Sequence, residues 1–392
     1  MLRKFQQHCM LDLKIIKSLY KFLLIHADII VAFKLKGKAR SDLVVVRLDA
    51  IGDFILWLDS AKEYRRLYPK KKITLIANSA WADLARHLPF WDEVLAVEPR
   101  LFIRNPLYRW KLIRKIRQEG FKLAIQPTFS RELLLGDSII RASGANERVA
   151  SIGDLSNISS FEKAISDKWY TSLTPAVDNQ LMELNRNAEF ITHLASTEYH
   201  AKLPKLPFII DLPTHFGLRD DYLILFPGAS WVGKQWPISS FAICLDELSS
   251  EYGWQIVLCG SAYEYSLCQS IVEQSMSINV INLAGKTSLP EFVEVARGAR
   301  VLVANDTSAI HIATAVATPS VCVLGGGHFG RFMPYSVELN GIKPVSIFSE
   351  MPCYGCNWTC SQPHEKDSCV PCIGQVSVQS VVTGVEAALN CE

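Results

Sequence analysis

The chain has 392 residues, a length that favours two domains over a single hydrophobic core. Its 41 basic and 39 acidic residues give a formal net charge of +2 at pH 7, so the overall charge argues against nucleic acid as a partner. The charge is uneven, because residues 1–40 contain nine Lys and Arg but only two Asp.

The basic N-terminal extension, residues 1–41, contains an apolar stretch at residues 11–33. Spanning a membrane takes roughly 20 mostly apolar residues, and here polar side chains interrupt every window of that length. The interrupting residues are Lys14, Lys17, Lys21, His26 and Asp28. The same lysines argue against a secretory signal. We therefore expect a cytoplasmic protein whose amphipathic extension either contacts the inner membrane surface through residues 1–40 or packs on the protein's own domain.

After the extension, apolar runs alternate with helix-periodic segments. The first run, at residues 43–48, is followed by a turn with Gly52 and by a helical segment that stops before Pro69. No run shows the strict alternation of a half-exposed strand. Residues 42–203 are therefore predicted to form a parallel sheet covered by helices on both faces.

A proline-rich segment at residues 204–219 interrupts this rhythm and predicts a linker. A second series of strands and helices occupies residues 220–347, including a helix that begins with the capping box of Ser288 and Glu291. The predicted fold class is α/β, with two Rossmann-like domains facing a cleft. In such sheets, ligands bind at the carboxyl ends of the strands.

The residues Asp306, Thr307 and Ser308 follow an apolar run and begin a helix in the second domain. The amide groups of a helix's first turn and its positive dipole end attract a diphosphate. Plain N-capping is the alternative interpretation, since these residue types are also the favoured caps.

Two further loops of this domain carry groups suited to a nucleotide. Residues 226–237 supply small residues, among them Ser230, and the compact cation of Lys234. A third loop contains Glu264, which could accept hydrogen bonds from ribose hydroxyls. Because all three loops leave strands of one sheet, together they predict a site for a nucleotide diphosphate.

The stretch Gly325–Gly330 has the spelling G-x-G-x-x-G of a dinucleotide fingerprint, which would indicate an NAD(P)-dependent oxidoreductase. That fingerprint requires a helix directly after the glycines, and Pro334 argues against one. We expect instead a loop whose backbone approaches a ligand.

In the first domain, Asp53 lies at the start of the first predicted helix, directly after Gly52. It could be only a helix cap. Facing the cleft, its carboxylate could act as general base on an acceptor hydroxyl, with Asp49 as the fallback.

Five of the 11 cysteines lie between residues 353 and 372. Two C-x-x-C pairs predict a closed tetrahedral shell for a structural zinc or iron ion. The expected ligands are Cys353, Cys356, Cys369 and Cys372. Cys360 could replace Cys356 or Cys369, and His364 also lies in this segment. We assign residues 348–374 to a metal-binding segment and residues 375–392 to a C-terminal helix.

Four stretches resemble glycosyltransferase family 9, the ADP-heptose heptosyltransferases of lipopolysaccharide synthesis. They are "RLDAIGDFILW", "FPGASWVGKQWP", "NLAGKTSLPEF" and "NDTSAIHIATAVATPSVCVLGG", in this order, and the resemblance covers most of residues 42–330. It implies a glycosyltransferase B-type fold, an inverting reaction without an obligatory catalytic metal, an N-terminal acceptor domain and a C-terminal nucleotide-sugar domain. It also implies the residue roles: Asp53 as base, Lys234 on the diphosphate, Glu264 on the ribose, and Asp306, Thr307, Ser308 and His311 around the diphosphate-sugar.

The cysteine-rich segment is similar to an iron-binding finger of relatives that place heptose on autotransporter proteins. The leading hypothesis is transfer of a sugar, heptose by resemblance, to a hydroxyl of a lipopolysaccharide core or related cell-envelope glycan. The partners are then a nucleotide-sugar donor and a glycolipid or glycan acceptor. The alternatives are a protein acceptor, the oxidoreductase, and a metal-stabilised scaffold without turnover.

Overall fold

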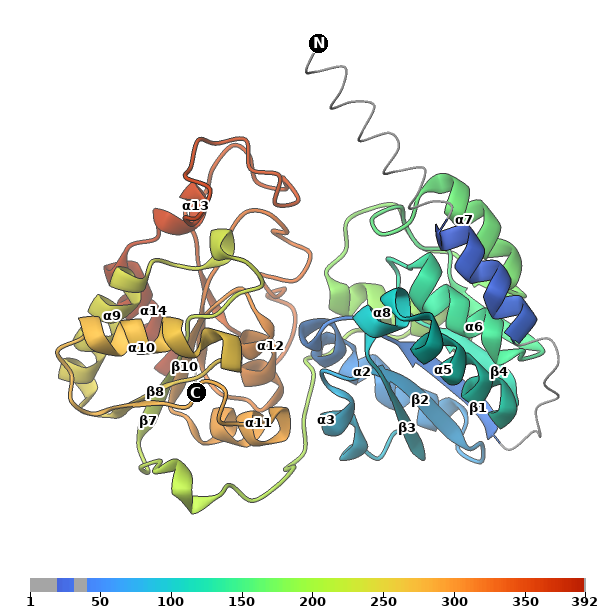
Figure 1. Ribbon diagram of the computed structural model, residues 1–392. Coiled ribbons are helices and arrows are strands. Elements are labelled where there is room, and N and C mark those ends of the chain that lie inside the picture. The colour runs from blue at the N-terminus through green and yellow to red at the C-terminus, as the bar shows by residue number, and fades with distance from the viewer. Residues whose placement is uncertain (1–19, 32–40, 391–392) are drawn as a thin grey trace, which may run out of the picture. The chain divides into compact units, whose positions relative to one another are not determined.

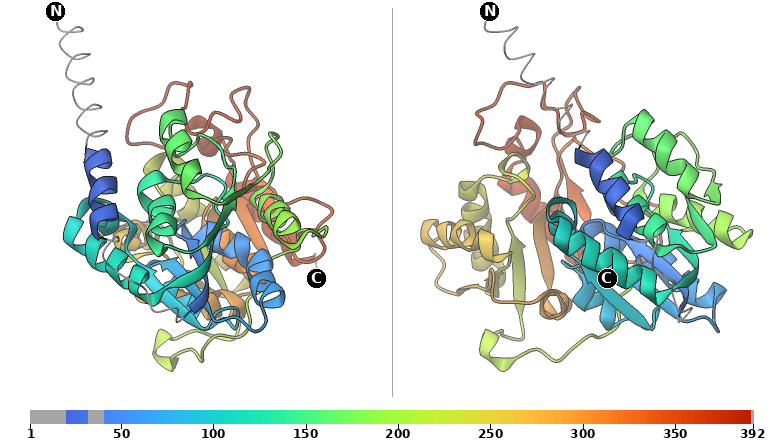
Figure 2. Two further views of the ribbon diagram at one scale, coloured as in Figure 1. Left: turned by 90° about the vertical axis from the view of Figure 1, so that its right-hand side faces the viewer. Right: turned by 45° about the vertical axis from the view of Figure 1, so that its right-hand side comes forward.

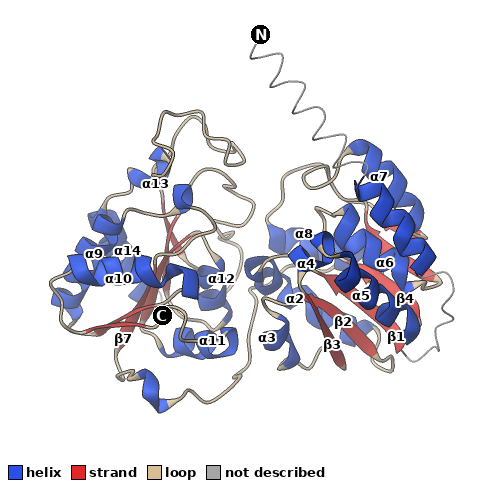
Figure 3. Cartoon of the chain, viewed as in Figure 1, coloured by secondary structure: helices blue, strands red, loops and turns tan. Residues whose placement is uncertain are grey.

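A computed structural model describes residues 20–31 and 41–390 of the chain. The chain divides into two compact units, one built mainly from residues before 178 and the other mainly from residues after 198 (Figure 1). Each unit is a sheet with helices on its faces (Figure 3).

The first unit contains a six-stranded sheet in the order β3-β2-β1-β4-β5-β6, and every neighbouring pair is parallel. The strands are β1 (Ser41–Arg47), β2 (Ile73–Asn78), β3 (Glu93–Val97), β4 (Phe121–Gln126), β5 (Glu147–Ser151) and β6 (Ser172–Thr174). In β1, Leu43 lies opposite Ile73 on one side and Leu123 on the other. Residues 43–47 of β1 are buried without interruption, which explains why the apolar run in this strand does not alternate.

The helices of this part of the chain are α2 (Ile51–Leu67), α3 (Ala82–Arg86), α4 (Pro99–Arg104), α5 (Pro106–Glu119), α6 (Ser138–Ser143), α7 (Ser160–Ser166) and α8 (Glu183–Ala195). Local chemistry sets the bounds of α5. The side chain of Asn105 accepts a hydrogen bond from the N–H of Tyr108, Pro106 occupies the first helical position, and Gly120 follows with a φ of 67°. Apolar residues of α5 and α6 then pack on one face of the sheet.

The helical segment 20–31 packs on the first unit, beside α5 and α7 (Figure 2). Leu24 and Ile25 are buried on its inner face, where Asp28 pairs with Arg109. Packing on the protein's own domain, one of the two expectations for the extension, is therefore confirmed for residues 20–31. Residues 1–19 and 32–40 lie outside the described part. Among the described residues, no helix is long and apolar enough to cross a membrane.

The second unit contains a six-stranded parallel sheet in the order β12-β11-β10-β7-β8-β9. The strands are β7 (Tyr222–Phe226), β8 (Gln255–Leu258), β9 (Val280–Asn282), β10 (Val301–Asn305), β11 (Ser320–Val323) and β12 (Val345–Ile347). The order reverses between β7 and β10, as it does between β1 and β4 in the first unit. Both sheets are thus doubly wound, which confirms the predicted α/β class with two Rossmann-like domains.

The helices of the second unit are α9 (Ile238–Tyr252), α10 (Tyr265–Gln274), α11 (Leu289–Gly298), α12 (Ser308–Ala315), α13 (Pro371–Gly374) and α14 (Val378–Leu389). The predicted capping box at the start of α11 is present. Helices α9, α10 and α14 share one apolar core with the strands, while α12 packs on β10 and β11. The proline-rich residues 204–213 contain no helix or strand.

Candidate functional site

Two loops leave the second sheet at one edge. β7 and β10 pair in parallel, with Leu225 opposite Val303, so their carboxyl ends lie side by side. The loop that carries Lys234 follows β7, and Asp306 follows β10 directly. Because the strand order reverses between these two strands, this is the edge at which doubly wound sheets bind ligands.

Asn305, the last residue of β10, connects the two loops. Its side-chain oxygen accepts a hydrogen bond from the N–H of Trp236 (3.0 Å), and its side-chain nitrogen donates to the carbonyl of Pro227 (2.7 Å). Asn305 is fully buried, so these bonds fix the path of the loop that carries Lys234. Sequence reasoning missed Asn305, although a polar residue at the end of an otherwise apolar strand was a signal.

Lys234 and Asp306 influence each other electrostatically. Burial lowers the pKa of Lys234 below its usual value, while the negative charge of Asp306 opposes this shift. Burial likewise raises the pKa of Asp306, and Lys234 opposes that. Each group is thus partly desolvated, and its main charged neighbour is the other. A ligand with negative charge would stabilise the ammonium group further.

The first turn of α12 is not capped by a side chain. Thr307 is the N-cap residue, but its hydroxyl makes no bond to the helix amides. Its Oγ1 is buried and has no hydrogen-bond partner among the described residues. Plain N-capping therefore does not account for Thr307. A buried hydroxyl and the amides from Ser308 onward are present at the edge where Lys234 lies.

His311, in the next turn of α12, is buried. Its Nδ1 lies 3.0 Å from the hydroxyl of Tyr335. Burial lowers the pKa of His311 to about 4, so the ring is neutral near pH 7. His311 can therefore offer a hydrogen bond at this site but no positive charge.

The structure also brings Glu264 to this edge. Its carboxylate accepts a hydrogen bond from the N–H of Ser261 (2.6 Å) and lies directly beneath Gly228, where a Cβ atom would be 1.8 Å from Oε1. A larger residue at position 228 would therefore displace the carboxylate of Glu264. Ser230, in the same loop as Gly228, is exposed.

The glycine-rich loop at residues 325–330 accommodates aromatic rings. A Cβ atom at Gly325 or Gly327 would collide with the ring of Trp358, and one at Gly326 with the ring of Tyr354. No helix follows this loop, and the next regular element is β12. The loop therefore lacks the helix that a dinucleotide fingerprint needs.

Trp358 joins this loop to Lys234. The ammonium nitrogen of Lys234 lies 4.2 Å from the centroid of the Trp358 ring, within the range of a cation–π interaction. His328 and Trp231 meet the same ring edge-on, with centroids 6.0 and 6.3 Å away. The side-chain oxygen of Asn357 accepts a 2.6 Å hydrogen bond from Nε2 of His328. Sequence reasoning assigned this segment only to metal binding and missed Trp358.

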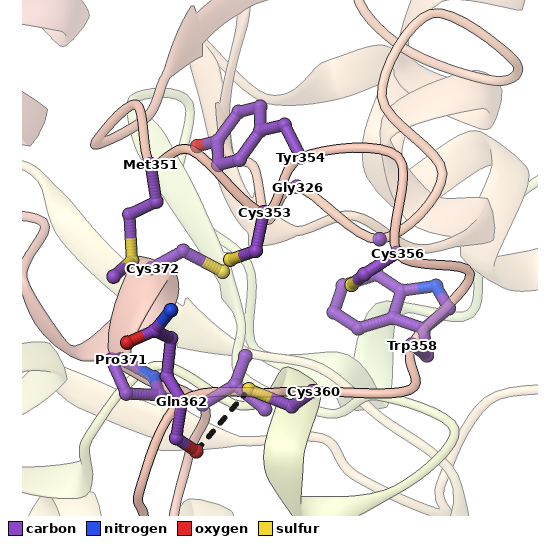
Figure 4. A pocket seen from close by; sticks show the side chains of 12 residues that line it. Gly326, Met351, Cys353, Tyr354, Cys356, Trp358, Cys360, Gln362, Pro371 and Cys372 are labelled. Carbon is purple, nitrogen blue, oxygen red and sulfur yellow. Dashed lines mark hydrogen bonds between the residues drawn. The ribbon is translucent and has the colours of Figure 1, made fainter.

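Four cysteines line one pocket in the cysteine-rich segment, as Figure 4 shows: Cys353, Cys356, Cys360 and Cys372. Burial raises the pKa of the Cys372 thiol, and the other three thiols add to this effect. Cys369 is not part of this lining, and its sulfur lies against Gly374 instead. The sulfur-only set fits zinc or iron chemically. However, no three or more His, Cys, Asp or Glu side chains among the described residues are arranged as a metal site.

The two candidate bases differ in their surroundings. Asp49 forms an ion pair with buried Arg47 (2.9 Å) and accepts a hydrogen bond from Thr128 (3.1 Å). Asp53 lies in the first turn of α2 and is partly exposed. Both carboxylate oxygens of Asp49 are therefore engaged, one by Arg47 and the other by Thr128.

Two doubly wound parallel sheets, with a lysine and an uncapped helix start at the carboxyl edge of the second, are typical of proteins that bind nucleotides or phosphates. The sequence profile of glycosyltransferase family 9 (heptosyltransferase) matches residues 109–357, more than half of the chain. The chain therefore belongs to this family and is a glycosyltransferase.

Individual relatives are distant. Lipopolysaccharide heptosyltransferase 3 of Escherichia coli is 24% identical over 304 residues, which cover 74% of this chain and 83% of the relative. The structure of the ADP-heptose lipopolysaccharide heptosyltransferase II of Escherichia coli is similar with a TM-score of 0.66 and 19% identity, covering 89% of this chain and 98% of the other. The iron-containing dodecameric glycosyltransferase TibC of enterotoxigenic Escherichia coli is similar with a TM-score of 0.52 and 14% identity, covering 91% and 80%. These structural likenesses show the fold.

Proposed function

We propose that the protein transfers heptose from ADP-heptose to a hydroxyl group of a lipopolysaccharide core or related cell-envelope glycan, with inversion. The family, and the activities for which these relatives are named, support the sugar and the acceptor class. The observation that carries the proposal is the buried hydroxyl of Thr307, which has no hydrogen-bond partner among the described residues and lies at the same sheet edge as Lys234.

In this proposal, residues 220–347 bind the nucleotide sugar. Lys234 and the amides at the start of α12 stabilise the charge that grows on the departing diphosphate. The hydroxyls of Thr307 and Ser308 add hydrogen bonds to it. Asp306 keeps the lysine charged in its desolvated position, because its carboxylate opposes the effect of burial. Glu264 binds the ribose, and Ser230 lies in the loop that closes over the nucleotide.

Residues 42–203 form the acceptor domain. Asp53 takes the proton of the acceptor hydroxyl as it attacks the anomeric carbon. The engagement of Asp49 with Arg47 and Thr128 supports this choice between the two carboxylates. The reaction uses no obligatory catalytic metal.

Cys353, Cys356, Cys360 and Cys372 would hold one structural zinc or iron ion. Four thiolates leave no open coordination position, so the ion would cross-link the segment and take no part in transfer. The presence of iron in TibC, which shares the fold, supports this assignment. The cysteines also favour a second candidate acceptor, a protein hydroxyl, because the cysteine-rich segment resembles that of autotransporter heptosyltransferases.

We place the protein in the cytoplasm, with peripheral membrane contact through residues 1–40. On the described part of this extension, Phe22, Leu23 and Ile30 are 54%, 59% and 71% exposed. Exposed apolar side chains beside basic ones are typical of helices that lie on anionic membranes.

A panel of nucleotide sugars, scored by release of the nucleoside diphosphate, tests the donor assignment. We expect ADP-heptose to be the best donor, and ADP release to depend on Lys234. Faster release from a donor with another base or sugar would overturn the donor assignment while leaving the transferase class intact.

A further inference from the structure

A cavity of about 160 Å³ lies in the first unit, between the helical segment 20–31 and helices α5 and α6. It has no role in the proposed transfer reaction. Its lining combines three apolar residues with four polar or charged ones: Ile25, Ile29, Ala142, Asp28, Arg117, Ser138 and Arg141. A single water needs roughly 10–15 Å³ on this measure, so the cavity has room for a small polyatomic ligand.

The negative charge of Asp28, the one acidic residue of this lining, is already neutralised by an ion pair. Both carboxylate oxygens of Asp28 accept hydrogen bonds from the guanidinium group of buried Arg109, at 2.6–3.0 Å. Arg109 and Asp28 thus form a neutral pair. The two remaining charged residues of the lining, Arg117 and Arg141, are both positive.

No described residue gives Arg117 or Arg141 a hydrogen-bond acceptor for its guanidinium group. The Nε of Arg117 is buried without a partner. Arg141 lies over the ring of Trp169, 4.4 Å from its centroid, and burial lowers its pKa. Residues 1–19 and 32–40 contain a single acidic residue, Asp12, so the rest of the extension brings little negative charge.

The backbone leaves space for this arrangement. Gly144 ends α6 with a φ of 62°, and a Cβ atom there would lie 1.0 Å from Nη1 of Arg117. The guanidinium group of Arg117 therefore fills the space that a side chain at position 144 would need. Both arginines are only half-buried, so a ligand can reach them from solvent.

We infer that this cavity binds a phosphate group through Arg117 and Arg141. Two guanidinium groups offer paired N–H donors that match the oxygens of a phosphate, and their charge matches that of a phosphate monoester. Ser138 supplies a further donor, and the apolar lining accommodates a short organic stem. A free phosphate compound and the headgroup of a membrane lipid share this chemistry. The exposed residues Phe22 and Leu23 lie on the same helical segment as Ile25.

Calorimetric titration of the full chain with inorganic phosphate tests the site, using Lys234→Ala protein so that the nucleotide edge contributes little. Arg117→Ala/Arg141→Ala should bind phosphate at least about tenfold more weakly, because a hydrogen bond to a charged group is typically worth that factor or more. The matched control is Arg114→Ala, since Arg114 is exposed on α5 and does not line the cavity.

Flotation with phosphatidylcholine vesicles, with and without phosphatidic acid, separates the two sources. If the parent binds inorganic phosphate in solution and the double variant does not, the result supports this cavity as the site and a free phosphate compound as its ligand. Binding only to phosphatidic acid vesicles, again lost in the double variant but kept in Arg114→Ala, supports the cavity and a lipid headgroup. If Lys234→Ala protein with both arginines intact binds neither probe, or if the double variant binds as well as its parent, the inference is wrong. The Lys234→Ala protein with both arginines intact must itself bind one of the probes. The inference can therefore be overturned even if the double variant does not fold.

Discussion

The ammonium nitrogen of Lys234 lies 4.2 Å from the centroid of the Trp358 ring. This contact joins the proposed diphosphate site to the cysteine-rich segment. A backbone hydrogen bond from the N–H of Val370 to the carbonyl of Gly233 (2.9 Å) reinforces it. The cysteine-rich segment therefore forms part of the environment of Lys234, and we expect donor binding to depend on its integrity.

Replacing Trp358 by Leu should weaken ADP binding about 2- to 12-fold. Without the ring, Lys234 is no longer held in place, and ordering such a side chain on binding costs about 0.5–1.5 kcal/mol. Calorimetry with ADP measures the change, and Trp358→Phe should restore most of the affinity. In a Lys234→Ala background, Trp358→Leu should have no further effect. If the two effects simply add, Trp358 does not act through Lys234.

Replacing Thr307 by Val should weaken ADP binding about 2- to 12-fold, because a neutral hydrogen bond is worth about 0.5–1.5 kcal/mol. The melting temperature of the free protein should not fall, since the hydroxyl has no partner to lose. Thr314→Val is the matched control on the same helix, because its hydroxyl donates to the carbonyl of Ile310 (3.0 Å). Thr314→Val should keep its ADP affinity. Unchanged ADP binding in Thr307→Val would remove that hydroxyl from the site.

His311 should make the free energy of unfolding sensitive to acid. Its pKa is about 4 in the folded protein and 6.5 normally, so the unfolded chain binds the extra proton between these values. Stability is therefore fully present above pH 6.5 and is lost as the pH falls towards 4, by up to ~3 kcal/mol. Urea unfolding of the wild type and His311→Phe across this range measures the difference. A constant difference between the two proteins would show that His311 is not a buried neutral ring.

Metal content should depend on Cys360 and not on Cys369. Cys360 lines the pocket with three other thiols, whereas the sulfur of Cys369 lies against Gly374. Elemental analysis of protein purified without chelator should show about one zinc or iron ion per chain, retained in Cys369→Ser and lost in Cys360→Ser. The opposite pattern would restore Cys369 as a ligand. If the purified protein contains no metal, the assignment of a structural ion to these cysteines is wrong.

The amino-acid sequence was sufficient to predict the sheets, because strands such as β1 and β10 are buried on both faces and are therefore continuously apolar. It also indicated Lys234 and Asp306 as candidates, since each follows such a strand. That β7 and β10 are neighbours is a property of the topology, which the order of segments along the chain does not reveal.

The contributions of Asn305 and Trp358 depend on contacts between distant residues. Asn305 contacts Pro227 and Trp236, and Trp358 fills the space that Gly325 and Gly327 leave. The same limit applies to the cysteines. Their spacing left open whether Cys360 or Cys369 is a ligand, and Cys360 lines the pocket with the other three cysteines.

Asp53→Asn should abolish transfer while leaving ADP affinity unchanged, because in the proposed reaction the general base acts on the acceptor hydroxyl and not on the nucleotide. Asp49→Asn should instead lower the melting temperature, since its carboxylate pairs with buried Arg47. Full activity in Asp53→Asn, with loss in Asp49→Asn, would move the base to Asp49.

Heptosyl transfer from ADP-heptose can be measured by mass spectrometry of a lipopolysaccharide core acceptor. The acceptor is incubated with ADP-heptose and either the wild-type protein or Asp53→Asn. We predict that the acceptor gains one heptose with the wild type, with one ADP released per transfer, and gains none with Asp53→Asn. An acceptor of unchanged mass, or an equal gain with both proteins, would contradict this account.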